Sequence, residues 1–100
     1  MRALLVVFHL PKGSSTSDHQ RFHRELYGRE TSSWGGRYQY RLRGLLDGIP
    51  HVLLYRGVVL IREEHLPVLE LFLRSYSAEY VWREAVPTEE DLRFLSADSE

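Results

Sequence analysis

An unbroken apolar run near the start of the chain constrains the fold more than any other feature. Residues 3–8 read Ala-Leu-Leu-Val-Val-Phe, and no polar side chain interrupts them. Such a run is typical of a β-strand that is buried on both faces and is therefore central in its sheet. Pro11 and Gly13 then end the run. The rest of the chain must supply the neighbours of this strand.

Two segments have the periodicity of amphipathic helices. Residues 17–27 place apolar and aromatic side chains at helical intervals, and Ser17 stands three residues before a glutamine, which is the spacing of a capping box. Gly28 follows as a C-terminal stop. A second helix is expected to open at Glu63, with Pro67 in its first turn.

Three further segments predict β-strands. Residues 37–43 and 79–86 alternate in side-chain character with the period of a strand. Residues 51–62 form a second apolar strand region that Gly57 interrupts as a bulge or a bend. The order β-α-β-β-α-β predicts an α+β ferredoxin-like sandwich, with four antiparallel strands and two helices on one face. After it, Thr88 with an aspartate three residues on indicates a short C-terminal helical turn.

The length and composition limit the classes of protein to consider. One hundred residues suffice for a single domain, which we expect over residues 1–95 with a frayed tail at 96–100. The chain has no cysteine, which excludes a disulfide scaffold, a thiolate zinc site and a cysteine nucleophile. No apolar run approaches the roughly 20 residues of a membrane span, and the apolar start is too short for a signal peptide. We therefore expect a cytoplasmic protein that does not enter a membrane. Twelve arginines against one lysine, no asparagine and two glutamines indicate a thermophilic origin.

The charge is unevenly distributed along the chain. The net charge of −1 excludes a uniformly basic nucleic-acid binder, yet residues 1–62 carry a net +6 and residues 63–100 a net −7. This asymmetry indicates a charged partner surface or a self-complementary dimer, unless the folded surface interleaves the two signs. The second face of the predicted sheet has no helix to cover it. Together with the apolar residues of the C-terminal segment, this predicts a homodimer.

A row of polar and basic side chains at strand period is the most concrete binding signal. Period-two spacing would place the row on one sheet face, where arginine offers paired donors to phosphate. Loops on either side of the first helix could extend it. The residues are Arg37, Gln39, Arg41 and Arg43 on the strand, and Arg29 and Lys12 on the loops. Basic residues near aromatic ones are typical of proteins that hold a nucleic-acid backbone. The alternative is that the arginines pair with acids such as Glu79 or Glu84 and stabilise the fold.

Lys12 also opens a Lys-Gly-Ser-Ser-Thr loop between the first strand and the first helix. Backbone N–H groups, hydroxyls and the ammonium group would converge there, which suits an anion such as phosphate. The sequence lacks the order of glycines and lysine that defines a P-loop. The alternative is a polar connection with a capping serine.

Three histidines are candidates for a metal site. His19 and His23 are four residues apart on the predicted helix, and His9 ends the first strand, from which it could approach them. Three imidazoles could hold zinc, nickel or copper with an open position. The alternative is that His19 borders the apolar stripe and His23 faces solvent. We predict no bound cofactor and no catalytic residue.

Several segments carry a family resemblance: the apolar strand Leu4–Phe8, the helix end Glu25-Leu26-Tyr27-Gly28, the aromatic strand after it, and the segment following Pro87. In these pieces the chain resembles the small CRISPR-associated ferredoxin-like proteins, which are the dimeric subunits of spacer-integration complexes, and their virulence-associated toxin relatives. The resemblance implies a dimer that contacts nucleic acid. Members that cut nucleic acid usually carry an aspartate just after the first strand as a metal ligand. Here His9 occupies that position, so the resemblance does not imply nuclease activity.

Taken together, these features predict a small dimeric protein that binds DNA or RNA without cutting it. Two alternatives from other classes stay open. One is a metal-dependent nuclease of the same fold, and the other is a small-ligand or structural dimerisation module with no role in nucleic-acid binding.

Overall fold

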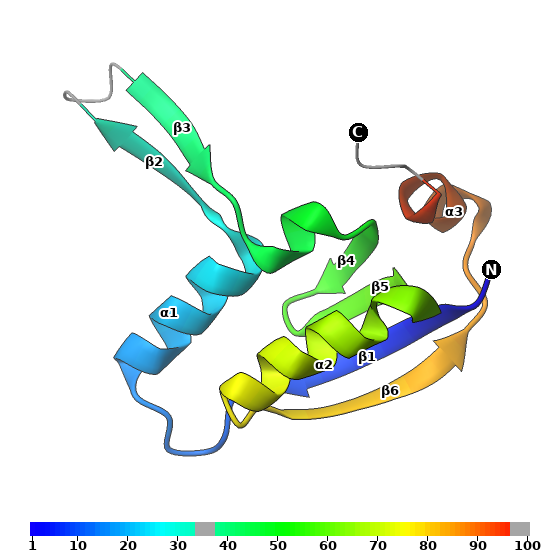
Figure 1. Ribbon diagram of the computed structural model, residues 1–100, viewed down its shortest axis with the longest axis horizontal. Helices are drawn as coiled ribbons and strands as arrows, with labels where there is room; N and C mark the ends of the chain where they lie inside the picture. Colours follow the sequence, from blue (N-terminus) through cyan, green and yellow to red (C-terminus); the bar gives the residue numbers. More distant parts are fainter. Residues whose placement is uncertain (34–37, 97–100) are drawn as a thin grey trace.

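The computed structural model describes the backbone of residues 1–33 and 38–96, and the side chains of residues 1–30 and 41–96. Strands and helices follow one another along the described chain as Figure 1 shows. In chain order they are β1 (Ala3–His9), α1 (Thr16–Tyr27), β2 (Arg29–Ser33), β3 (Tyr38–Leu42), the 3-10 turn η1 (Leu45–Gly48), β4 (His51–Tyr55), β5 (Val58–Arg62), the 3-10 turn η2 (Glu63–His65), α2 (Leu66–Ser75), β6 (Glu79–Ala85) and α3 (Glu89–Leu95).

The main sheet has the strand order β4-β5-β1-β6, and each neighbouring pair is antiparallel. β1 pairs with β5 on one side and with β6 on the other, so it is central, as its apolar run predicts. Helices α1 and α2 cover the same face of the sheet (Figure 1). This strand order with two crossover helices on one face is that of a ferredoxin-like sandwich, which confirms the predicted fold class.

The sequence pattern assigned one of the four strands to the wrong segment. Residues 51–62 are not one interrupted strand but the hairpin β4–β5, whose turn is Arg56-Gly57. Gly57 adopts φ +80°, a conformation that side chains rarely allow, and its carbonyl accepts a hydrogen bond of 2.9 Å from the N–H of Phe8. The chain therefore reverses at Gly57, and this hairpin supplies two strands of the main sheet.

The segment expected to fill that position lies elsewhere. β3 pairs with β2, and within the described chain the two strands form a separate ribbon that projects from the end of α1 (Figure 1). β2 reads Arg-Glu-Thr-Ser-Ser and has no apolar side chain to contribute to a core. The β4–β5 hairpin offers more apolar surface to bury, since Val59, Leu60 and Ile61 of β5 are all buried, and it takes the place of the ribbon in the sheet.

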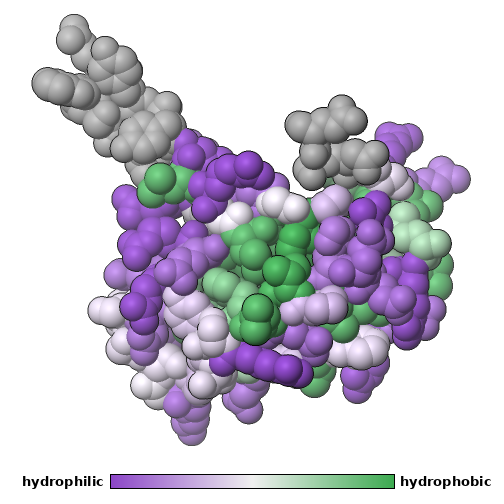
Figure 2. All heavy atoms as spheres, in the orientation of Figure 1, coloured by the Kyte–Doolittle hydropathy of each residue, from purple (hydrophilic) through white to green (hydrophobic). Residues whose placement is uncertain are grey.

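The core lies between β1, β5 and the two helices. Leu4, Val6 and Phe8 point to this side and are buried, together with Phe22 from α1 and Leu69 from α2. Part of the apolar surface around this core remains open to solvent. Figure 2 shows hydrophobic surface gathered between α1 and α2, with hydrophilic surface around it.

The second face of β1 is only partly covered, which corrects the prediction of burial on both faces. The apolar C-terminal segment, which contributes to the prediction of a homodimer, is in part buried within the subunit itself. Helix α3 packs on this face at one end of the sheet, where Leu95 is fully buried against Ala3 and Leu60. Toward the other end the face is open, and Val7 remains 39% exposed.

The helix boundaries agree with the sequence in two places and differ in two. The helix expected to open at Glu63 begins at Leu66 instead, because Glu63–His65 form the 3-10 turn η2. Ser15, not Ser17, caps α1 by accepting a 3.0 Å hydrogen bond from the Asp18 N–H. Gly28 ends α1 as predicted, with φ +77°. Thr88 and the aspartate three residues later form a reciprocal capping box at the start of α3.

Candidate functional site

A groove of about 990 Å³ lies between one face of α1 and the β4–β5 turn. We call it the α1 groove. Among the residues whose side chains are described, the charged members of its lining are three arginines. Two histidines stand among them, and no aspartate or glutamate does. The lining residues are Thr16, His19, Gln20, His23, Arg24, Tyr27, Gly28, Arg29, Leu53 and Arg56. The groove is therefore a concave surface that carries positive charge and no compensating carboxylate, which suits an anion.

Local structure explains why these cations meet. The lining positions of α1 recur every three or four residues, so they share one face of the helix. Arg29 opens β2 directly after the turn at Gly28, beside the C-terminal end of that face. Arg56 comes from far along the chain, at the tip of the β4–β5 hairpin. In the part of the chain described, Arg24, Arg29 and Arg56 make no ion pair, whereas Arg2, Arg41, Arg62 and Arg74 do.

Tyr27 holds the β4–β5 turn against α1. Its hydroxyl accepts a 3.0 Å hydrogen bond from the backbone N–H of Gly57, next to Arg56. Burial is the main cause that raises the pKa of Tyr27, so its hydroxyl stays neutral at physiological pH. This contact determines where Arg56 enters the groove.

A smaller recess of about 350 Å³ opens beside the groove. It shares His19, His23, Tyr27 and Arg56 with the groove, and we call it the aromatic recess. Its remaining lining is mainly apolar and comes from Phe8, Leu10 and Phe22, with His9 and Gly57 at its margin. The imidazole of His23 stacks on the Tyr27 ring, with 5.4 Å between the ring centroids and 22° between the planes.

His23 is the titratable group at the junction of the two cavities. Partial burial lowers the pKa of His23, and the positive charges of Arg56 and His19 lower it further. The imidazole is therefore neutral at pH 7. An anion bound beside Arg56 would oppose these causes and favour protonation.

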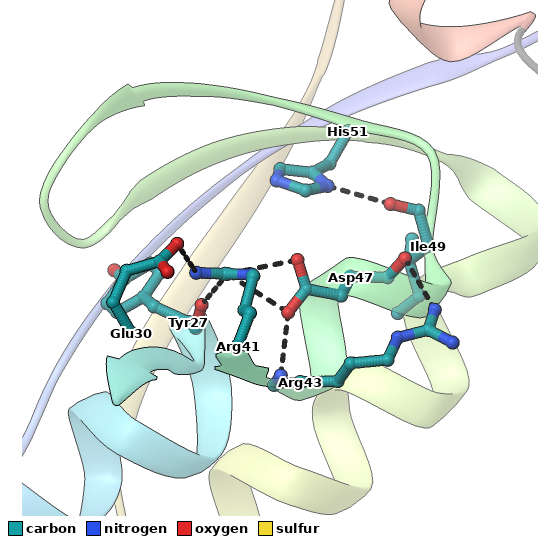
Figure 3. Close-up of polar contacts among 8 residues, drawn as sticks. Tyr27, Glu30, Arg41, Arg43, Asp47, Ile49 and His51 are labelled. Atoms are coloured by element: carbon teal, nitrogen blue, oxygen red, sulfur yellow. Dashed lines mark hydrogen bonds and ion pairs between the residues drawn. The ribbon is translucent and has the colours of Figure 1, made fainter. Parts of the chain in front are cut away.

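The predicted arginine row divides between several environments. Arg41 faces inward to the base of the ribbon (Figure 3), where its Nη2 lies 3.0 Å from both carboxylate oxygens of Asp47 and also donates to the Tyr27 carbonyl. Its Nη1 lies 3.8 Å from Glu30. The Arg43 Nη2 donates to the Asp47 carbonyl at 3.1 Å. The partners are nearby backbone carbonyls and the carboxylates of Asp47 and Glu30, not the acids of residues 63–100.

The other members of the row are placed as follows. Arg29 lines the α1 groove, and Lys12 is exposed on the loop before α1 without lining it. Arg37 and the side chain of Gln39 lie outside the described residues. Of the four predicted binding residues whose side chains the structure describes, Arg29 alone lines the groove.

Asp47 is the centre of the polar contacts at the base of the ribbon. Burial acts to raise its pKa, but the 2.7 Å hydrogen bond from the Gly44 N–H and the neighbouring Arg41 outweigh it, and the pKa of Asp47 is lowered overall. The carboxylate therefore stays ionised and joins η1 to β3. Figure 3 also shows the His51 ring beside η1, with Nδ1 2.7 Å from the Ile49 carbonyl oxygen.

The three candidate histidines all line the aromatic recess. Within the described residues, no group of three or more histidine, aspartate or glutamate side chains is arranged to hold a metal ion. His9 has other partners: its Nδ1 lies 2.8 Å from the Leu10 carbonyl oxygen, and its Nε2 lies 3.7 Å from Glu79. His19 and His23 instead line the cationic groove.

Sequence reasoning missed Arg24 and Arg56. A signal for Arg24 was present, because it is one helical turn from Gln20 and shares the face that carries His23. No local signal marks Arg56, since its place in the groove depends on how the β4–β5 hairpin packs against α1.

Fold and site together define an α+β ferredoxin-like domain with a cationic groove on its first helix. No protein-family model, curated protein or solved structure matches the chain, so the groove is interpreted from its own chemistry. No helix among the described residues has the length and apolar character needed to cross a membrane.

Proposed function

We propose that this protein binds nucleic acid and that the arginines of the α1 groove hold its phosphate backbone. The observation that carries the proposal is the lining of the groove, which combines Arg24, Arg29 and Arg56 with two histidines and no carboxylate. A cationic concave surface is notable on a chain whose net charge is −1. Such a local concentration of positive charge is what a binder of polyanions requires.

The shape of the groove favours a polyanion over a single small anion. Its three arginines come from three different elements, and its volume of about 990 Å³ is at the upper end of the range typical for ligand pockets. A phosphate backbone can contact all three guanidinium groups at once, whereas one phosphate group cannot fill the groove. Arg43 and Lys12 are exposed near the two ends of α1, and we propose that they extend the contact as the sequence suggests.

Binding without cleavage is the form of this function that we propose. A magnesium-dependent phosphodiesterase needs carboxylates grouped around the ion. His9 stands where the resemblance would require an aspartate, and its neighbours are a backbone carbonyl and Glu79. The relation to the CRISPR-associated ferredoxin-like family, the cytoplasmic location and the thermophilic origin remain proposals drawn from the sequence.

We also propose that the protein is a homodimer that associates through the open part of the second sheet face. Val7, Val58 and Val81 lie side by side there on three neighbouring strands, and Val81 is 55% exposed. α1 covers the opposite face of the sheet, so a dimer formed in this way would leave both grooves accessible. Two grooves per dimer would strengthen binding to a long strand.

The test of nucleic-acid binding is a titration of labelled oligonucleotides at several salt concentrations. Three phosphate contacts to a single strand predict a slope of about −2 for log affinity against log salt. The variant R24A/R56A should weaken binding and reduce the slope by about 1.4. The control R21A/R93A removes the same charge outside the groove and should change little. Absence of binding by the wild type, or an equal loss in the control, would contradict the proposal.

A further inference from the structure

The aromatic recess adds a second kind of chemistry to the α1 groove. His19, His23, Tyr27 and Arg56 belong to both cavities, so the recess opens where the arginines of the groove converge. On one side of this junction the lining is cationic, and on the other side it is apolar and aromatic. A cationic surface and an aromatic one are thus adjacent.

The walls of the recess have the character of a base-stacking site. The His23 ring is stacked on Tyr27 and packs edge-on against Phe22, with centroids 6.0 Å apart and planes at 88°. Two aromatic neighbours therefore hold the imidazole in one orientation. Arg56 is exposed at the rim, and its planar guanidinium can also stack on a base.

The size of the recess limits what can enter. A volume of about 350 Å³ lies at the lower end of the range for ligand pockets. It admits one planar heterocycle with part of its sugar and excludes a base pair. Phe8 and Phe22 are themselves almost fully buried in the core, so the floor of the recess is firmly supported.

From this arrangement we infer that the ligand is single-stranded nucleic acid and that one unpaired base enters the aromatic recess while the flanking phosphates lie in the α1 groove. The inference rests on the proposed function and specifies its substrate class. Bases in a duplex are paired and stacked, and one would first have to leave the helix to reach the recess. Stacking on aromatic side chains tolerates any base, so we expect little sequence preference.

The first experiment measures what the base contributes to the affinity independently of the phosphate backbone. The wild-type protein is titrated, at one fixed salt concentration, with a single strand, with an abasic strand of the same length and with a duplex. Loss of the stacked base should weaken binding by roughly tenfold or more, and the duplex should also bind more weakly than the intact strand. The abasic strand should retain the salt dependence, because its phosphates are unchanged.

Variants then assign the effect to the recess. His23→Ala removes the stacked wall and should bring the affinities of the intact and abasic strands close together. His23→Phe keeps an aromatic ring of similar shape and should preserve most of the difference. The matched control Arg24→Ala should weaken binding to both strands alike and leave their ratio unchanged. Thermal melting of each variant checks that it is folded.

A measurement on the wild type covers the case in which His23→Ala does not fold. Addition of adenosine monophosphate should shift the ring proton resonances of His23 and Tyr27 through the ring current of the base. Ribose 5-phosphate carries the same phosphate without a base and should not produce this shift.

The outcomes distinguish the inference from the proposed function. Equal, salt-dependent binding of intact and abasic strands, or tighter binding of the duplex, would overturn the inference and leave nucleic-acid binding in place. A single-strand preference that His23→Ala leaves unchanged in a folded protein would also overturn it. No binding of any strand would overturn both.

Discussion

A Cβ atom on Gly44 would lie 2.3 Å from the backbone nitrogen of Gly28, so the two glycines bring two chain segments into direct backbone contact. One segment leaves α1 at Gly28, and the other returns from β3 at Gly44. The Arg41–Asp47 ion pair lies at the same junction. Because Gly28 also lines the α1 groove, this junction connects the base of the ribbon to the candidate site.

The first prediction concerns the contact between these glycines. Gly44→Ala should lower the free energy of unfolding by about 1–3 kcal/mol, because the added methyl group meets backbone atoms that cannot move independently. Gly48→Ala is the matched control, since a Cβ there has no atom within 4 Å. Urea denaturation of the two variants measures the difference. Equal stability of both variants would show that the segments at Gly28 and Gly44 can move apart without a loss of folding free energy.

The second prediction concerns the Arg41–Asp47 pair. The lowered pKa of Asp47 means that its contribution to stability is present above the unfolded value of about 3.8 and is lost as the pH falls through the folded value. In Asp47→Asn, the free energy of unfolding should therefore fall less steeply as the pH is lowered below about 3.8. At neutral pH it should cost about 1 kcal/mol, a modest loss because the Arg41 side chain is 42% exposed.

Denaturation at a series of acidic pH values checks this effect. Glu64→Gln is the control, since it removes a carboxylate that is 65% exposed and pairs with Arg62 on another part of the molecule. If the free energy of unfolding fell equally steeply with acid in Asp47→Asn and in the wild type, the role of Asp47 would be contradicted.

The third prediction concerns His23. Its pKa is lower in the folded protein than its unfolded value of 6.5, so the unfolded chain binds more protons over the intervening range. The contribution of His23 to stability is thus fully present above pH 6.5 and is lost as the pH falls through the folded pKa. His23→Gln should make stability less dependent on pH over this window. Denaturation curves on either side of pH 6.5 measure the change, and an unaltered dependence would contradict it.

The fourth prediction concerns the packing of α3. Leu95 is fully buried against Ala3 and Leu60, so Leu95→Ala should cost about 2–3 kcal/mol, near the low end for buried leucine because α3 is short and peripheral. Phe94→Ala is the control, because Phe94 is 54% exposed. Thermal melting compares the two. A larger loss from Phe94→Ala would place Phe94 in an interface rather than in solvent.

The fifth prediction concerns association. If the open sheet face forms the dimer, Val81→Asp should produce a monomer, because it introduces an unpaired charge into an apolar contact. Leu71→Asp on α2 is the control, since Leu71 is 71% exposed on the helical side. Light scattering gives the mass of each variant. A wild-type monomer, or a dimer that only Leu71→Asp disrupts, would exclude this face.

The elements that the sequence predicted correctly depend on local physics. The apolar run made β1 central, Gly28 ended α1, and the Thr88 capping box opened α3. Each of these features follows from the backbone preferences, side-chain period or hydrogen bonds of neighbouring residues. The sequence by itself therefore determined the fold class and the approximate position of most of its elements.

The strand partners and the candidate site were decided only by the tertiary structure. Segments 38–42 and 51–55 both have strand character. Segment 51–55 joins the main sheet because the turn at Gly57 pairs it with β5, whose Val59 and Ile61 are fully buried in the core. Likewise, Arg24 and Arg56 meet because the Gly57 turn hydrogen-bonds to Tyr27 and Phe8. Such contacts join residues about thirty or more positions apart, and their free energy depends on packing that no local pattern encodes.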